Sequence, residues 1–227
     1  AARSEHFFTA LVCLTVLGSS EPWVAACQAV WLGIWLWAGV SKMNHHFPSV
    51  IMVMMNNGPF FPQALKRRLF RAFPDDLRPS GFAIGMARMG TLIELSIPAL
   101  LVLSPSPEFT FGALCVMTVF HGYIALNNPS GMPIEWNIAM VYGGWFLFGM
   151  RPEASLTALL AHPALLAFLV AVLLLIPAYG NVVPSRVSFL LAMRYYAGNW
   201  AYTIWLFRGD SAAKLSKLKK AAGTLRE

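Results

Sequence analysis

Four ionisable side chains interrupt stretches of the chain that are otherwise apolar: Lys42, Glu94, His121 and Glu135. A charge at the centre of a bilayer costs roughly 2.5–3.5 kcal/mol on insertion scales, so such groups normally face the interior of a helix bundle. A lysine can serve as a general base, and carboxylates and histidines can accept and return protons. These four residues are therefore the candidate catalytic residues.

Four further polar residues accompany them in the sequence. His45 and His46 follow the lysine by about one helical turn, in "VSKMNHHFPS". Arg88 lies on the same predicted helix as the glutamate at 94, and Asn137 comes two residues after the glutamate at 135. Imidazole, guanidinium and amide groups all hydrogen-bond polar ligands, so these four are candidate cofactor-binding residues.

Each candidate also has a purely structural interpretation, and both interpretations stay open at this stage. Lys42 can reach the membrane interface with its long side chain. Arg88 and Glu94 can lock neighbouring helices through ion pairs, and we expect both to be buried and partnered. His121 can form a hydrogen bond between helices. Glu135 is stabilised by the dipole at the start of a helix.

The histidines do not have the spacing of a metal site. The chain has five histidines, two of them adjacent, and contains no HExxH or ExxH pair. It also contains no P-loop, no GxGxxG and no GxSxG. We predict no metal site, and the identity of any cofactor stays unknown.

The composition predicts an all-α, polytopic membrane protein. Apolar residues make up 57% of the chain and charged residues 12%, whereas soluble domains carry about 25% charge. A single soluble core of 227 residues could not bury this much apolar surface. Strands of alternating polarity, which a membrane barrel needs, are absent from the sequence.

The apolar stretches predict a bundle of five to six spans. Two shorter segments differ from them: Phe47–Met55 reads as a re-entrant or interfacial helix, and Gln63–Arg71 as a basic amphipathic helix. We assign residues 1–207 to a transmembrane helical domain and residues 208–227 to a basic amphipathic cytoplasmic tail. The expected spans are Phe7–Leu17 (short), Trp23–Met43, Ser80–Leu103, Phe109–Leu126, Ile134–Met150, Leu159–Ala178 and, if it crosses, Arg186–Phe207.

The basic residues predict the orientation in the membrane. The net charge is +7, concentrated in the tail and in the loop between Lys42 and Ser80. Positive loops face the cytoplasm. We therefore expect the protein in a bacterial inner (plasma) membrane, with this loop and the tail on the cytoplasmic side, provided that Arg186–Phe207 does not cross. This distribution suits anionic lipid headgroups and argues against nucleic acid as a partner.

Several motifs resemble known membrane families. The order of "ELSIP", "FHGYIALNNPSGMPIEWNIAMVYGG" and "RYYAGNW" resembles an uncharacterised family of bacterial polytopic membrane proteins, common in actinobacteria. "AGVSKMN" is similar, more distantly, to a motif of the horizontally transferred transmembrane domain superfamily, which includes the vitamin-K-dependent γ-carboxylase. The carboxylase resemblance implies that Lys42 is a base acting on a reduced quinone-like substrate. The resemblance covers roughly Trp31 to Trp205.

Two classes of function follow. The first is a lipid- or cofactor-contacting subunit of a membrane assembly, with membrane lipids, other membrane-protein subunits or a quinone-like or pigment ligand as partners. The second is a membrane enzyme that uses a lysine base on a quinone-like or lipid substrate. We favour the first, and the convergence or dispersal of Lys42, His121 and Glu135 would distinguish them.

Overall fold

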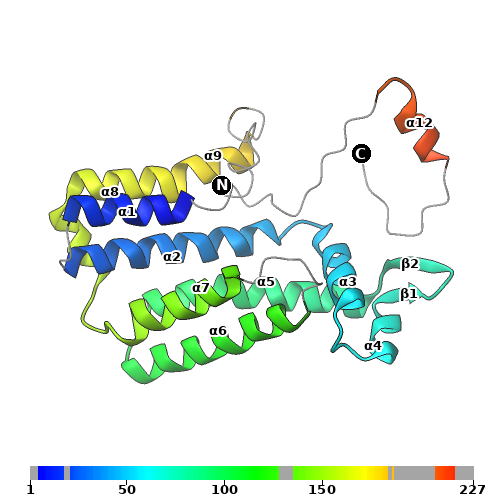
Figure 1. Ribbon diagram of the computed structural model, residues 1–227, viewed down its shortest axis with the longest axis horizontal. Helices are drawn as coiled ribbons and strands as arrows, with labels where there is room; N and C mark the ends of the chain where they lie inside the picture. Colours follow the sequence, from blue (N-terminus) through cyan, green and yellow to red (C-terminus); the bar gives the residue numbers. More distant parts are fainter. Residues whose placement is uncertain (1–4, 18–20, 128–134, 184–185, 187–207, 218–227) are drawn as a thin grey trace.

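The computed structural model describes residues 5–17, 21–127, 135–183, 186 and 208–217 of the chain, and these residues are mostly helical (Figure 1). The first part of the bundle consists of α1 (Glu5–Leu17), α2 (Glu21–Ser41), α5 (Gly81–Val102), α6 (Pro107–Asn127) and α7 (Glu135–Gly144), which the π-helical turn η1 (Trp145–Gly149) extends. The second part begins with the 3-10 helix η2 (Leu156–Ala161). After a break at His162, α8 (Pro163–Val170), the π-helical turn η3 (Ala171–Leu175) and α9 (Ile176–Val182) form one continuous rod.

Four helical segments within the described ranges are long and apolar enough to cross a membrane: Pro22–Ser41, Gly81–Val102, Pro107–Asn127 and Pro163–Val182. At 1.5 Å per residue, about 20 residues span the hydrocarbon core of a bilayer. These segments coincide with four of the expected spans. The expected span Ile134–Met150 corresponds to α7 and η1, which are shorter than these four.

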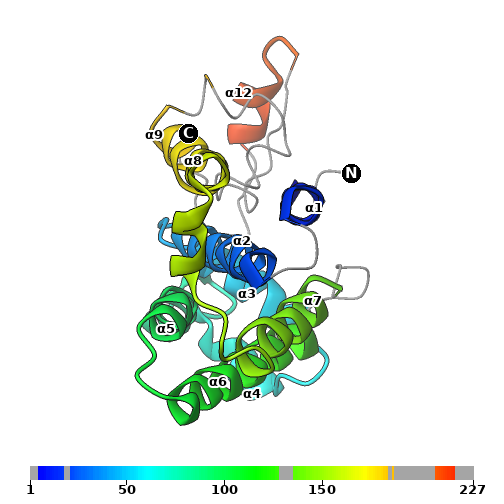
Figure 2. The ribbon, with the colours of Figure 1, turned by 90° about the vertical axis from the view of Figure 1, so that its left-hand side faces the viewer.

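Helix α2 lies at the centre of the bundle, because nearly every face of it is apolar and finds a partner. One hydrophobic core packs α2 against α1, η2 and α8 through residues such as Ala26, Val30 and Leu169. A second core packs α2 against α5, α6 and α7, with Trp35 and Met117 at its middle. Figure 2 shows this arrangement end-on, with α8 and α9 on one side of α2 and α5, α6 and α7 on the other.

A glycine lets α2 and α5 approach closely near the end of α2. A Cβ atom added at Gly39 would lie 2.7 Å from Leu95 Cδ2 and 3.3 Å from the Leu95 backbone nitrogen. No side chain fits there without movement of α5. The crossing brings the end of α2, and the lysine that follows it, against the middle of α5.

The chain between α2 and α5 differs from its expected form. Helix α3 (Phe47–Asn57) is present as predicted, and α4 (Gln63–Arg68) begins as predicted. The prediction that α4 continues to Arg71 was wrong, because the chain turns into an antiparallel hairpin of β1 (Phe70–Ala72) and β2 (Asp76–Pro79).

Local hydrogen bonds and Pro74 explain the hairpin. Pro74 cannot donate the backbone hydrogen bond that a helix interior requires, and the Ser80 N–H donates to the Leu69 carbonyl at 2.9 Å to close the hairpin. The Ser80 side chain also accepts from the Ala83 N–H, so it caps α5 as the sequence predicts.

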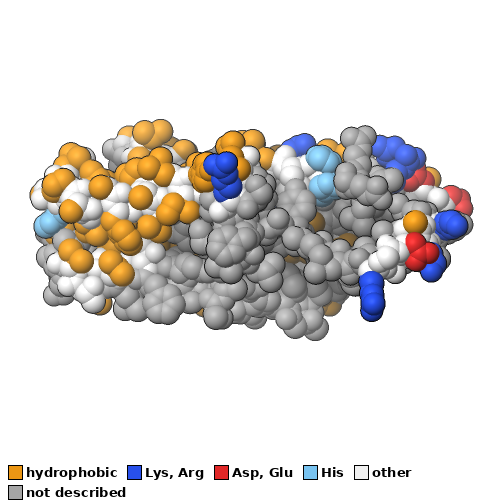
Figure 3. Space-filling model, turned by 90° about the horizontal axis from the view of Figure 1, so that it is seen from above, with side chains coloured by type: hydrophobic (Ala, Val, Ile, Leu, Met, Phe, Trp, Pro, Cys, Tyr) orange, Lys and Arg blue, Asp and Glu red, His pale blue; other side chains and the backbone are white. Residues whose placement is uncertain are grey.

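Charged side chains gather at the end of the molecule that carries this hairpin, whereas hydrophobic side chains cover the opposite end (Figure 3). Helix α12 (Ser211–Ser216) forms the described part of the tail, and Lys214 there pairs with Asp210 at 3.1 Å. Most of the segment Arg186–Phe207 and the end of the tail lie outside the described residues, so their relation to the membrane stays a prediction.

Candidate functional site

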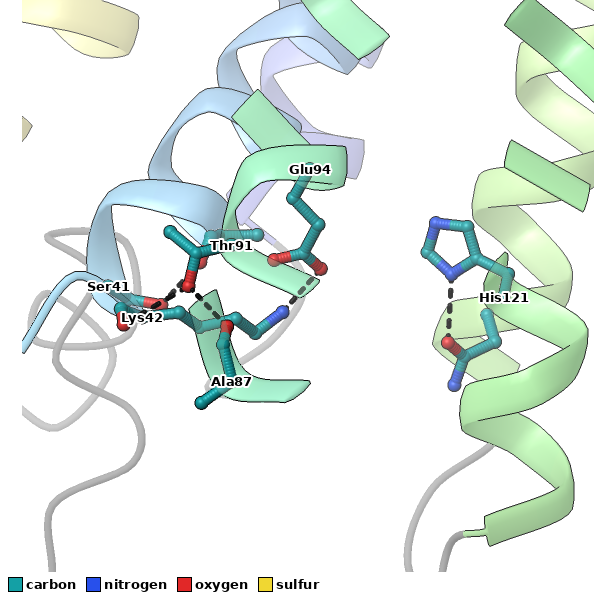
Figure 4. Close-up of polar contacts among 8 residues, drawn as sticks. Ser41, Lys42, Ala87, Thr91, Glu94 and His121 are labelled. Atoms are coloured by element: carbon teal, nitrogen blue, oxygen red, sulfur yellow. Dashed lines mark hydrogen bonds and ion pairs between the residues drawn. The ribbon is translucent and has the colours of Figure 1, made fainter. Parts of the chain in front are cut away.

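A buried ion pair joins the end of α2 to the middle of α5. Lys42 Nζ donates to Glu94 Oε1. The side chains of Lys42 and Glu94 are only 10% and 8% exposed, so water contributes little to their solvation. Figure 4 shows the lysine side chain reaching from the chain just after α2 to the carboxylate on α5. Two of the four catalytic candidates therefore meet directly.

Neighbouring backbone and side-chain contacts hold this pair in place. The buried Thr91 hydroxyl donates to the Ala87 carbonyl at 2.9 Å and lies 3.3 Å from the Lys42 carbonyl oxygen. The Phe47 ring lies under the ammonium, with 5.8 Å between Lys42 Nζ and the ring centroid. A cation above an aromatic face is stabilised by the ring quadrupole. The turn after α2 is thus held to α5 by Thr91 and Glu94, and to α3 by Phe47.

The carboxylate of Glu94 is only half satisfied. Its second oxygen, Oε2, is buried and has no hydrogen-bond partner among the described residues. A buried carboxylate oxygen without a partner is costly, because it has lost its water and gained no replacement. The position therefore retains an unused acceptor inside the bundle.

A second polar pair lies on the neighbouring helices. His121 of α6 is buried, and its Nδ1 lies 2.9 Å from Asn137 Oδ1 of α7. The ring of Trp35 stacks on the His121 ring, with 5.7 Å between centroids. In Figure 4 the His121 ring extends from α6 toward the side on which Glu94 lies.

Trp35 of α2 contacts the second pair through the His121 ring. It precedes Lys42 by seven residues, and Lys42 is the first residue after the end of α2 at Ser41. The indole nitrogen Nε1 of Trp35 is buried and has no hydrogen-bond partner among the described residues. A buried donor without a partner thus accompanies the buried acceptor of Glu94.

Arg88, His45 and His46 make contacts of their own. Arg88 was expected to be buried and is not: it is exposed, and its Nη1 donates to the Met43 carbonyl at 3.2 Å. Arg88 lies six residues before Glu94 on α5 and faces outward, whereas its neighbour Ala87 is buried. The His45 and His46 rings contact each other just before α3, tilted by 43° with 4.2 Å between their centroids. The side chain of Glu135 lies outside the described residues, so its convergence with Lys42 and His121 stays untested.

Three residues that position the site were missed from the sequence. Trp35 looks like any other tryptophan of an apolar span. Gly39 belongs to the AGVSKMN motif, but it was not singled out as the point where two helices approach closely. Asn44 did carry a signal, since asparagine before a short helix is a preferred cap; its Oδ1 accepts from the N–H groups of His46 and Phe47 at 2.8 and 3.0 Å.

The titratable groups do not assemble into a metal centre. Among the residues that the structure describes, no three histidine, cysteine, aspartate or glutamate side chains lie together in a way that could hold a metal ion. The cluster consists of one ammonium, one carboxylate, one imidazole and one indole. These groups can donate and accept hydrogen bonds.

Comparison with known proteins gives one match. Residues 1–227 match the family described as "Transmembrane protein of unknown function (DUF3556)". No curated protein and no solved structure matches the chain.

Proposed function

The chain belongs to the DUF3556 family of transmembrane proteins, and we propose that it is a ligand-contacting subunit of a membrane assembly that binds a quinol-like head group between α2, α5 and α6. The observation that carries the proposal is the unused hydrogen-bonding capacity inside the bundle. An ion pair that served only to lock two helices would satisfy both carboxylate oxygens. Here Glu94 Oε2 and Trp35 Nε1 are both buried and unpartnered.

The chemistry of these two groups selects the ligand. Glu94 Oε2 accepts a hydrogen bond, and Trp35 Nε1 only donates one. A hydroxyl group does both, so it complements the pair. A quinone carbonyl could bond the indole but has no proton for the carboxylate. A phosphate would be repelled by the carboxylate charge. The reduced, hydroxyl-bearing form of a quinone-like molecule is therefore the best complement.

The surroundings suit the hydrophobic part of such a ligand. The second core, which contains Trp35, Ile97 and Met117, lies directly beside the polar cluster. Ligand pockets in proteins are mostly apolar, with a few polar groups that fix the orientation of the ligand. The ring of a quinol would stack between aromatic and aliphatic side chains while its hydroxyl reaches Glu94.

Binding of a short-chain quinol to the purified protein in detergent tests the proposal. We expect calorimetric titration to show tighter binding of the quinol than of the corresponding quinone. Trp35→Phe removes the unpartnered N–H and keeps an aromatic ring, so it should weaken quinol binding about fivefold, the value of one ordinary hydrogen bond. Trp31→Phe is the matched control, because its N–H is already used by the Met140 carbonyl at 3.2 Å. Equal losses in the two variants would contradict the proposal.

A membrane enzyme with Lys42 as base is the second candidate, favoured by the direct contact between Lys42 and a carboxylate. In the ion pair, however, Lys42 Nζ is the hydrogen-bond donor. An amine that acts as a base must present a lone pair, so the pair has to open before Lys42 can accept a proton. Consumption of the bound quinol, measured by product analysis over time, would establish this function. Stable recovery of the unchanged quinol supports the subunit.

The arrangement in the membrane completes the proposal. We infer that α7 and η1 form a short fifth span beside the four long ones, in the inner membrane. The connection from α2 to α5 and the basic tail then face the cytoplasm, following the positive-inside rule. The contact between Gly58 and Asn127 supports this inference, because it brings the end of α6 to the same end of the bundle as α3.

A further inference from the structure

A hollow of about 530 Å³ lies where the connection between α2 and α5 meets the start of α5. Three arginines, three phenylalanines and one serine line it. These residues are Arg67, Arg68, Arg71, Phe70, Phe73, Ser80 and Phe82. A basic and aromatic lining of this kind combines attraction for an anion with affinity for apolar chains.

The three arginines have no carboxylate partner among the described residues. Two other basic residues of the same connection are already engaged: Lys66 donates to the Asn56 carbonyl at 2.9 Å, and Arg78 forms a two-point bond with Asp76. Arg71 donates a hydrogen bond from its Nε to the Pro79 carbonyl at 3.3 Å. Three guanidinium groups thus share one hollow, and the carboxylate of Asp76 attracts Arg71 but already accepts the hydrogen bonds of Arg78. An anion in the hollow would relieve the mutual repulsion of the three guanidinium groups.

The hollow lies at the end of α5 where this helix would enter the membrane. Phe82 is the second residue of the candidate span Gly81–Val102, and it is 43% exposed. Phe73, 51% exposed, stands opposite with the Arg67 guanidinium 5.9 Å from its ring centroid. The hollow therefore lies at the level where a membrane-spanning helix leaves the apolar region, which is the level of lipid phosphates.

We propose that this hollow binds the phosphate of an anionic phospholipid, with Arg67, Arg68 and Arg71 as ligands and the acyl chains along Phe82 and the first turns of α5. Arginine forms paired hydrogen bonds with phosphate oxygens, and each basic residue near an anionic surface strengthens lipid binding. The phenylalanines contact the apolar part of the lipid, which inorganic phosphate lacks. This site is separate from the polar cluster at Glu94 and stands without it.

Binding of fluorescent dioctanoyl phosphatidylglycerol to the full chain in uncharged detergent tests the proposal. We expect dioctanoyl phosphatidylcholine to bind at least tenfold more weakly. Arg68→Gln and Arg71→Gln should each weaken phosphatidylglycerol binding about fivefold. Arg151→Gln is the matched control, since it removes one exposed arginine that lies outside the hollow, and it should leave the affinity unchanged.

Two further arms separate a lipid site from alternatives. Inorganic phosphate at the same concentration as the lipid should not displace it, and displacement would show a site for free phosphate instead. Arg68→Lys keeps the charge but loses the planar fork, so it should retain an intermediate affinity and guards against a Gln variant that fails to fold. Equal binding of both lipids, or wild-type affinity in both Gln variants, would overturn the proposal.

Discussion

Breaking the ion pair between Lys42 and Glu94 should destabilise the bundle more than any exposed ion pair does. Both side chains are about nine-tenths buried, so Lys42→Met leaves an unpartnered carboxylate inside the protein. Loss of one partner of a buried pair costs about 3–5 kcal/mol. Glu94→Gln should cost a similar amount, because it leaves the ammonium without its counter-charge.

The double variant Lys42→Met/Glu94→Gln distinguishes pairing from simple loss of packing. No uncompensated charge remains in it, so its free energy of unfolding should be well above the value expected from adding the two single losses. We expect an interaction energy of about 3 kcal/mol in this double-mutant cycle.

Equilibrium unfolding in mixed micelles of detergent and dodecyl sulphate measures these free energies. The matched control is the cycle for Arg151 and Glu153, which lie 3.9 Å apart and are 49% and 52% exposed. Exposed pairs contribute about 0–1 kcal/mol, so that cycle should give a value near zero. An interaction energy for Lys42 and Glu94 no larger than this control would refute the reasoning.

Three other predictions concern the rest of the chain. Gly39→Val should separate α2 from α5 and destabilise the protein by about 1–3 kcal/mol or more in the same unfolding assay. Gly85→Val is the control, because Gly85 has open space around it, and it should not destabilise the protein. Equal effects of the two variants would contradict the close crossing of α2 and α5. Hydrogen bonds from Arg78 lower the pKa of Asp76 to about 2, so the interaction between these two residues stabilises the hairpin above roughly pH 4 and is lost as the pH falls through about 2. Arg78→Gln should return the pKa of Asp76 toward about 4, which a carbon-13 NMR titration of the carboxyl groups measures. An unchanged pKa of Asp76 in this variant would contradict the prediction. A cysteine at Arg67, in a background without the three native cysteines, should react with an impermeant maleimide only from the cytoplasmic side; labelling from the other side would reverse the topology.

The span helices could be predicted from the sequence because their signal is local. An apolar run of about 20 residues is sufficient to place a membrane helix, and α2, α5, α6 and the rod from Pro163 to Val182 follow that rule. Ser80 was predicted as a cap for the same reason, since a cap depends on neighbours within one turn. The hairpin after α4 was missed, because a basic segment with leucine and phenylalanine fits an amphipathic helix equally well until Pro74 is weighed.

For the candidate site, the sequence indicated some of the residues but not their contacts. Ionisable residues in apolar stretches indicated Lys42, Glu94 and His121, and all three are indeed buried or nearly so. Their partners depend on which helices become neighbours, and Lys42 and Glu94 are 52 residues apart. The unpartnered indole of Trp35 depends on helix rotation as well, which composition does not reveal.

The most direct test of the proposed function is a density map of the full chain in nanodiscs after addition of a short-chain quinol. The proposal predicts a ring between α2, α5 and α6, with a hydroxyl oxygen at hydrogen-bonding distance, about 2.5–3 Å, from Glu94 Oε2. The Trp35 indole nitrogen should contact the same head group. A map recorded at a saturating concentration of quinol, in which Glu94 Oε2 is bonded only by water or by the protein's own chain, would contradict the proposal.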